Sequence, residues 1–343
     1  MKVFLTGGTG FIGQPLTKAL LAKGWEVVAL SRKPDGTPAR ALDQLGAECV
    51  RGEITDRESM RACMTGADLV IQGAGHYEFG VDAAGKRRMQ AVNVDGTRNV
   101  LDLALELGVP HSIHISTVVT FGDSGPQMRD EAFERCSPCR TTYDRTKTEA
   151  HAIARSYQQR GLPLIIVCPS GVIGPNDHSP WGYYLRAYLN RVMPPMCWSA
   201  NCIFSLVEVN DLAKGIALAA ERGRPGETYF FTGEPKCFRE HVGFWFEKPG
   251  AFRFRAWLPV GFMASLLRAL EPLQRAAGLS AFMSRETVLA AATNLNYSSM
   301  KAQQELGWTH CTAQEMWFKT IDAELDLLRT RKKRDLVSRL NPV

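Results

Sequence analysis

The sequence predicts an α/β protein: a Rossmann-type doubly wound parallel sheet with a smaller, mainly helical C-terminal substrate lobe. The first observation behind this prediction is the order of segments at the start of the chain: a β-forming run at residues 3–5, a glycine-rich turn at 6–13, a helical run at 15–23 and a second β-forming run at 25–30. The second observation is that strand-like and helix-like segments alternate up to residue 168. This alternation requires a parallel sheet that helices cover on both faces.

The glycine-rich turn has the sequence T-G-G-T-G-F-I-G. Gly7 permits a tight turn, Gly10 allows the backbone to approach a pyrophosphate, and Gly13 allows the helix to pack close to its strand. The free N–H groups of the following helix attract the anion, and Phe11 and Ile12 belong to the predicted cofactor contacts. A flexible turn without a ligand is the alternative, but the complete strand–turn–helix–strand frame favours a dinucleotide site.

The end of the second strand predicts which dinucleotide binds. An acidic residue at this point would bind both ribose hydroxyls and select NAD(H). The sequence instead has Ser31 followed by Arg32. A guanidinium binds a phosphate through two hydrogen bonds, so these residues predict NADP(H) rather than NAD(H). A basic loop without this role is the alternative.

The next segments extend the predicted cofactor-binding edge. We expect helices at 42–45 and 57–65 and strands at 48–51 and 68–72. The loop after residue 51 can place Ile54 on the adenine face and Glu53 against its amino group. The strand at 68–72 ends in Gly73, Ala74 and Gly75. Such small residues let a ligand approach the backbone at the carboxyl end of a strand.

The remaining segments divide the chain into parts. We expect a long helix at 90–107, strands at 111–116, 164–168 and 228–232, a strand-to-helix unit at 207–220 and further helices at 181–192 and 260–273. Residues 1–175 and 207–233 are therefore assigned to the NADP-binding Rossmann domain. Residues 176–206 and 234–325 are assigned to the substrate-binding lobe, and 326–343 to a basic C-terminal tail.

Tyr143 and Lys147 are the candidate catalytic pair. Their i, i+4 spacing in a predicted helix places them on one face, about one turn apart. A neighbouring cation favours the phenolate, so Lys147 is expected to lower the pKa of Tyr143 toward the range of a general acid for carbonyl reduction. Thr117 lies at the carboxyl end of the strand at 111–116, where this fold binds ligands, and can hold the carbonyl oxygen. Ser116 is the rival for that role.

Taken together, the ordered motifs resemble those of the extended short-chain dehydrogenases/reductases, the superfamily of NAD(P)-dependent epimerases and dehydratases. In character the chain is most similar to the dihydroflavonol reductases and 3β-hydroxysteroid dehydrogenases. The resemblance covers roughly residues 1–325 and rests on T-G-G-T-G-F-I-G, G-E-I-T-D, N-V-D-G-T-R-N, I-S-T-V-V-T-F-G, Y-D-R-T-K and P-S-G-V-I-G-P.

The resemblance implies roles for individual residues. It makes Thr117, Tyr143 and Lys147 the catalytic set, with Lys147 also binding the nicotinamide ribose. It places Asn93 in the cofactor-side hydrogen-bond network. It also packs a short run of backbone against the nicotinamide, namely Pro169, Ser170, Gly171 and Val172.

Two departures from the resemblance concern the substrate. Cys168 stands where the family often has an arginine, and residues 201–206 contain no arginine where sugar-nucleotide enzymes usually carry one. A diphosphate would lack its main electrostatic partner there. The second lobe is instead rich in rings, which suit an apolar ring or acyl substrate: Trp181, Tyr183, Tyr184, Phe244, Trp245, Phe252, Phe254, Trp257 and Phe262.

Composition excludes several other classes of protein. The nine cysteines are scattered and odd in number, and the one C-x-x-C, at 136–139, has no second pair, so we expect reduced thiols and no metal site. The formal net charge of +6 is partly local to 329–339, where a solvated tail is expected rather than a membrane-surface or nucleic-acid contact. The first strand begins too early for a cleaved signal, so we expect a cytoplasmic protein.

These observations predict an NADP(H)-dependent oxidoreductase that reduces a ketone, or oxidises the matching alcohol, of a steroid-, flavonoid- or acyl-like molecule. A sugar epimerase or dehydratase and a non-catalytic NADP-binding sensor are the alternatives. The amphipathic run at 260–273 could contact a membrane surface. We instead expect it to be a helix of the lobe whose apolar face points inward. A homodimer through 90–107 and 143–159 would fit the resemblance.

Overall fold

A seven-stranded parallel sheet forms the centre of the computed structural model, which describes residues 1–193, 195–248, 251–276 and 284–340. The strand order is β11-β6-β5-β4-β1-β2-β3. The strands are β1 (Lys2–Thr6), β2 (Glu26–Ser31), β3 (Glu48–Arg51), β4 (Leu69–Gln72), β5 (His111–Ile115), β6 (Leu164–Pro169) and β11 (Thr228–Phe231). The order reverses between β1 and β4, which is where a doubly wound sheet binds its ligand. The predicted fold class is therefore confirmed.

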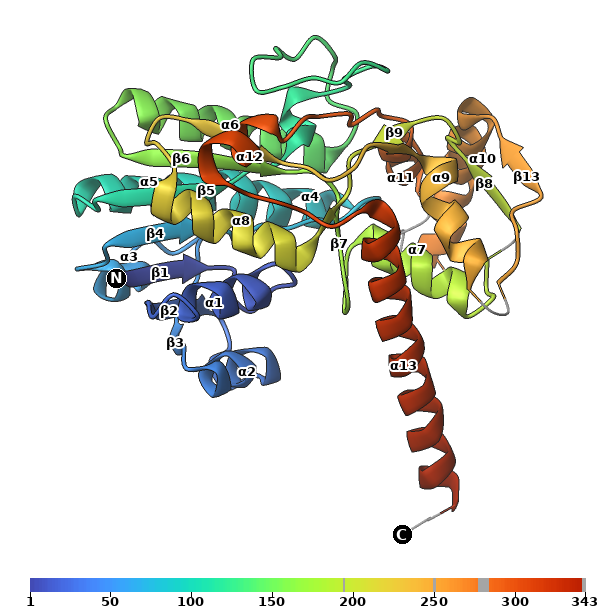
Figure 1. The fold of residues 1–343 in the computed structure, drawn as a ribbon, viewed down its shortest axis with the longest axis horizontal. Helices are drawn as coiled ribbons and strands as arrows, with labels where there is room; N and C mark the ends of the chain where they lie inside the picture. The colour runs from blue at the N-terminus through green and yellow to red at the C-terminus, as the bar shows by residue number, and fades with distance from the viewer. Residues whose placement is uncertain (194, 249–250, 277–283, 341–343) are drawn as a thin grey trace.

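Helices cover both faces of this sheet (Figure 1). One face packs on α1 (Gly13–Leu21), α2 (Thr37–Leu45), α8 (Val209–Arg222) and α12 (Met300–Leu306). The other face packs on α3 (Glu58–Met64), α5 (Gly96–Glu106) and α6 (Thr142–Gln159). Alternate residues of each strand enter the two cores, as in β1, where Phe4 belongs to one core and Val3 and Leu5 to the other.

The helix predicted at 90–107 begins earlier than expected. α4 (Ala83–Gln90) continues through a π-helical turn (Ala91–Asp95) into α5. The Asp82 carboxylate caps the start of α4 by accepting a 2.8 Å hydrogen bond from Gly85 N. α4 buries only Met89, so its sequence has no apolar periodicity that could have revealed it.

The second lobe is mainly helical, as predicted, and lies at the right of Figure 1. Its helices are α7 (Pro180–Leu189), α9 (Phe238–Gly243), α10 (Val260–Ala276), α11 (Arg285–Ala291) and α13 (Ala313–Leu340), with a 3₁₀ turn at Phe244–Glu247. Short two-stranded sheets lie outside the central sheet: β7 (Val172–Ile173) pairs with β10 (Val207–Glu208), β8 (Met196–Trp198) with β13 (Ala256–Leu258), and β9 (Ile203–Phe204) with β12 (Lys236–Cys237).

Two helices of the lobe differ from the simplest expectation. α10 buries Met263 and Leu267 in the core, but Phe262 and Leu273 on another face are 57% and 66% exposed. The inward apolar face is thus confirmed, together with a second, exposed one. The residues predicted to form a basic tail begin inside α13, which extends away from both parts of the molecule (Figure 1). No helix in the described part of the chain has the length and apolar composition that crossing a bilayer requires.

Candidate active site

The glycine-rich turn between β1 and α1 packs directly on the end of β4. Gly7 has a φ of +80°, and a Cβ atom there would lie 2.8 Å from Ala74 N. A Cβ atom on Gly13 would lie 2.1 Å from Gly7 O. Thr6 Oγ1 accepts hydrogen bonds of 3.1 Å from both Gly73 N and Ala74 N. Only glycine fits Gly7 and Gly13, and the resulting cradle of backbone at the strand-order reversal suits a dinucleotide.

The end of β2 carries the residues predicted to select the cofactor. Ser31 is buried and accepts a 3.2 Å hydrogen bond from Lys33 N, whereas Arg32 is exposed. Arg51 of β3, which no sequence pattern marked, also lies at this edge, and its Nη1 lies 3.4 Å from Arg32 O. The sequence could not predict this position of Arg51, because it depends on the pairing of β2 with β3.

The two residues predicted to contact adenine differ in their surroundings. Glu53 is exposed. Ile54 is 6% exposed and packs against α5, where a Cβ atom on Gly96 would lie 2.7 Å from its Cγ1. Ile54 is therefore part of the core, and an adenine contact by either residue stays a prediction.

Asn93 joins the β4–α4 loop to α6. Its Oδ1 accepts a 2.7 Å hydrogen bond from His76 N, and its Nδ2 donates to His76 O at 3.0 Å and to Thr146 Oγ1 at 3.1 Å. The π-helical turn that contains Asn93 is a kind of distortion that often occurs at functional sites. A Cβ atom on Gly75 would lie 3.6 Å from Asn93 Oδ1, so the network adjoins the predicted cofactor edge.

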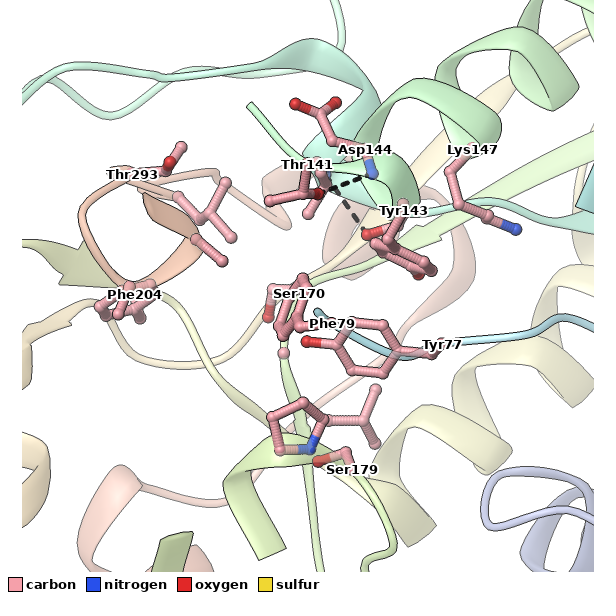
Figure 2. A pocket seen from close by; sticks show the side chains of 18 of the residues that line it. Tyr77, Phe79, Thr141, Tyr143, Asp144, Lys147, Ser170, Ser179, Phe204 and Thr293 are labelled. Carbon is pink, nitrogen blue, oxygen red and sulfur yellow. Dashed lines mark hydrogen bonds between the residues drawn. The ribbon is translucent and has the colours of Figure 1, made fainter. Parts of the chain in front are cut away.

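Thr117, Tyr143 and Lys147 all line one cavity (Figure 2). The Thr117 hydroxyl lies within reach of the Tyr143 phenol, where hydrogen bonding to it favours the ionised form. Ser116, the rival of Thr117, instead lies 2.8 Å from His151 Nδ1 through its Oγ. The geometry therefore favours Thr117 as the partner of Tyr143.

The pKa values of the pair differ from the sequence expectation. Burial raises the pKa of Tyr143 above its ordinary value, and the hydrogen bond with Thr117 only partly offsets this. The predicted lowering of this pKa by Lys147 is therefore wrong for the structure described. Burial also lowers the pKa of Lys147 to about 8, and Lys147 Nζ donates a 2.8 Å hydrogen bond to Ile115 O.

The start of α6, which carries Tyr143, is anchored by a partly buried ion pair that the sequence did not reveal. Arg135 donates from Nη1 and Nη2 to the two carboxylate oxygens of Asp144, at 2.7 and 2.9 Å. Arg135 also donates to Val119 O at 3.1 Å, in the turn that follows Thr117. This bidentate ion pair therefore holds the segments of Tyr143 and Thr117 in a fixed arrangement relative to each other.

The cavity has a volume of about 300 Å³. Among the predicted residues, Phe11, Ile12, Gly73, Gly75, Ser116 and Pro169–Val172 also line it. Gly7, Gly10, Gly13, Ala74, Ser31, Arg32, Glu53, Ile54 and Asn93 do not, and lie in the adjoining turn and along the sheet edge. The predicted site residues therefore form two groups: one lines the cavity, and the other lies along the sheet edge where the cofactor is predicted to bind.

Aromatic rings form much of the cavity wall, but they are mostly not the ones predicted. Of the predicted rings, only Trp181 and Tyr184 line it, joined by Tyr77, Phe79, Trp198, Phe204 and Phe238. Phe244, Trp245, Phe252, Phe254 and Trp257 belong to the core or pack against it, and Tyr183 and Phe262 are exposed. Figure 2 shows Phe204 far from Lys147, across the cavity.

Four of the five charged side chains that line the described cavity form two ion pairs. Arg140 Nη2 lies 3.0 Å from Asp123 Oδ2, in addition to the ion pair of Arg135 with Asp144. These four residues and Lys147 are the charged side chains among the described residues that line the cavity. The two arginines are thus compensated within the protein.

Comparison with known proteins identifies the family. The sequence pattern of the NAD dependent epimerase/dehydratase family matches residues 3–230. The chain belongs to this family. A Synechocystis sp. relative, a dihydroflavonol 4-reductase by name, is 31% identical over 321 residues, which cover 89% of each chain. The epimerase/dehydratase family relationship makes this chain an NAD(P)-dependent enzyme of the extended short-chain dehydrogenase/reductase type.

Two further similarities are one to a relative in sequence and one to a solved structure in fold. The 4-hydroxy-2-methyl-3-oxo-4-farnesyl-3,4-dihydroquinoline-1-oxide ketoreductase of Stigmatella aurantiaca is 28% identical over 320 residues, covering 90% of this chain and 92% of the relative. DesIV, a dTDP-glucose 4,6-dehydratase from Streptomyces venezuelae solved with NAD, shares the fold with a TM-score of 0.77 at 21% identity, covering 95% and 97% of the two chains.

Proposed function

We propose that this enzyme is an NADP(H)-dependent ketone reductase, or the reverse alcohol dehydrogenase, for an uncharged hydrophobic small molecule. The observation that carries the proposal is that Thr117 and Tyr143 lie together at the wall of an aromatic cavity whose arginines are already paired with carboxylates. A general acid, an orienting hydroxyl and a largely apolar pocket together suit carbonyl reduction.

The residues divide the chemistry as follows. A nicotinamide bound along Gly73, Gly75 and Pro169–Val172 would supply the hydride. Thr117 orients the carbonyl oxygen of the substrate, and Tyr143 donates its phenolic proton to that oxygen. The raised pKa of Tyr143 keeps the phenol protonated, and a developing alkoxide is basic enough to accept the proton. Lys147, whose Nζ donates to Ile115 O, would bind the nicotinamide ribose as a cation below the pH at which it loses its own proton.

The charge balance of the cavity supports a neutral substrate. A diphosphate needs cations to pair with, and Arg135 and Arg140 are each held by a carboxylate, which leaves Lys147, bound to Ile115 O, as the remaining cation of the described cavity lining. Removing either arginine from its partner would leave a partly buried charge uncompensated. The ketoreductase of Stigmatella aurantiaca, whose name specifies a farnesylated ketone, is consistent with a hydrophobic substrate.

The test is a panel of steroid, flavonoid and acyl ketones with NADPH or NADH, followed by absorbance of the reduced nicotinamide. We expect turnover with at least one apolar ketone and a preference for NADPH. Tyr143→Phe should bind NADPH normally but lose at least roughly a hundredfold in kcat, because it lacks the transferable proton. Full turnover by Tyr143→Phe would contradict the mechanism.

A sugar epimerase or dehydratase is the second candidate, because the fold matches DesIV over 95% of this chain. Such an enzyme would regenerate its own cofactor. Turnover of a nucleotide sugar by the purified protein, without added nicotinamide, would favour this candidate over the ketone reductase.

A further inference from the structure

Glu286, the second residue of α11, binds two segments of the Rossmann domain at once. Its Oε1 accepts hydrogen bonds from Thr142 N and Thr142 Oγ1, both 2.9 Å long. Its Oε2 accepts a 3.1 Å hydrogen bond from Gly80 N. Glu286 and Thr142 are 144 residues apart in the sequence, so this clamp exists only in the folded chain.

Both partners of Glu286 lie next to Tyr143. Thr142 is the first residue of α6, whose N–H has no partner within the helix, and Tyr143 follows it directly. Gly80 lies in the loop that carries Tyr77, and the ring centroids of Tyr77 and Tyr143 are 4.4 Å apart. The rings lie one above the other in Figure 2. One carboxylate therefore holds both the backbone that directly precedes Tyr143 and the loop that carries Tyr77, whose ring packs on Tyr143.

The helix that carries Glu286 also contacts the substrate cavity. Thr287, Ala290 and Ala291 of α11 line the cavity. The other end of α11 is tied to the same region, because Arg140 Nη1 donates to Ala292 O at 3.0 Å and to Thr293 Oγ1 at 3.2 Å. α11 thus spans the cavity between two attachments to the segment that leads into α6.

We propose that Glu286 is a positioning residue that holds Tyr143 in the orientation needed for proton transfer and couples it to the α11 wall of the substrate cavity. The inference rests on the proposed function in one respect, namely that Tyr143 is the proton donor. Neither hydrogen-bond partner of Glu286 is a group that reacts, so Glu286 acts through the geometry of Tyr143 alone.

The kinetic test compares Glu286→Gln and Glu286→Ala with Asp322→Asn. Asp322 is a matched control, because it is a lobe carboxylate whose 2.6 Å ion pair with Lys248 does not involve the cavity. We expect kcat to fall roughly tenfold in Glu286→Gln and up to roughly a hundredfold in Glu286→Ala, as misplaced catalytic groups do. The Kd for NADPH should not change. A kcat equal to that of Asp322→Asn, or weakened NADPH binding, would overturn the proposal.

A second readout needs no substrate and so separates this proposal from the proposed function. The ultraviolet titration of Tyr143 is obtained as the difference between each protein and its Tyr143→Phe variant. In the parent enzyme burial should suppress ionisation of Tyr143 around pH 10, where an ordinary phenol titrates. Glu286→Ala and Glu286→Gln should show ionisation at lower pH, because a released Tyr143 is better solvated. Titrations that match Asp322→Asn would overturn the positioning role even if no ketone is reduced.

Discussion

Lys147 donates a 2.8 Å hydrogen bond from Nζ to Ile115 O while its side chain is buried, and burial lowers its pKa to about 8. Below pH 8 the amine is charged in the folded and unfolded states, so folding bears the full cost of burying the charge. Between about 8 and the ordinary value near 10.5, the unfolded chain binds the proton more tightly. The contribution of Lys147 to folding stability therefore rises with pH across this window.

This dependence predicts a difference between the enzyme and Lys147→Met. The free energy of unfolding of the parent enzyme should rise relative to Lys147→Met between pH 8 and 10.5, by on the order of 3 kcal/mol. Urea unfolding of both proteins at several pH values measures the difference, and groups common to both cancel. A difference that stays constant, or that falls with pH, would show that Lys147 is not a buried amine of lowered pKa.

Arg32 carries the second residue-scale prediction. If Arg32 binds the 2′-phosphate of NADP(H), Arg32→Ala should raise KM for NADPH by roughly 10- to 100-fold, which corresponds to a hydrogen bond to a charged group. KM for NADH should change little, so the ratio of kcat/KM for the two cofactors is the measurement. Arg51→Ala is the companion variant, because Arg51 Nη1 lies 3.4 Å from Arg32 O. An unchanged cofactor ratio in both variants would contradict the assignment.

The sequence predicted two kinds of site residue. One kind lies close to its partner along the chain, and the other lies at the end of a strand. Tyr143 and Lys147 are four residues apart on one helix, and Thr117 follows β5. It did not predict the direction of the pKa shift of Tyr143, because burial outweighs charge there. It also missed Glu286, whose partners are 144 and 206 residues away in sequence.

Among the helices and strands, the predictions succeeded where burial gives the sequence a recognisable pattern of apolar residues. The main strands are apolar runs buried on both faces, so the sequence located them and the parallel sheet followed. The paired strands β7 and β10 have two residues each, which is too short to show a period. The aromatic residues of the lobe were visible in the sequence, but folding alone decides which of them line the cavity.

The two faces of α10 are expected to contribute differently to the free energy of unfolding. Leu267 is 5% exposed and belongs to the large core, whereas Leu273 is 66% exposed. Leu267→Ala should lower the free energy of unfolding by about 2–5 kcal/mol, because it leaves a cavity in packed core. Leu273→Ala should change it by less than about 0.5 kcal/mol. Denaturant unfolding of the two variants tests this, and a large loss in Leu273→Ala would show that its exposed face is covered in solution.

At the scale of the whole molecule, the Rossmann domain and the lobe share one hydrophobic core. Val70 and Ile166 of the sheet belong to the same buried cluster as Val288, Trp245 and Trp317 of the lobe. The chain also crosses between the two parts several times, because β11 returns to the sheet after the segment that contains α7. One of the two cores of the sheet therefore extends into the lobe, while the other packs on α1, α2, α8 and α12.

A shared core predicts that the two parts unfold together. Differential scanning calorimetry should show a single endotherm whose van't Hoff and calorimetric enthalpies agree. NADPH at a hundred times its Kd should stabilise the folded state by about 2.7 kcal/mol and shift the whole endotherm upward, although the predicted cofactor contacts lie mainly in the Rossmann domain. Two endotherms, of which only one moves with NADPH, would show that the lobe folds independently and that Glu286 and Arg140 join two separately stable units.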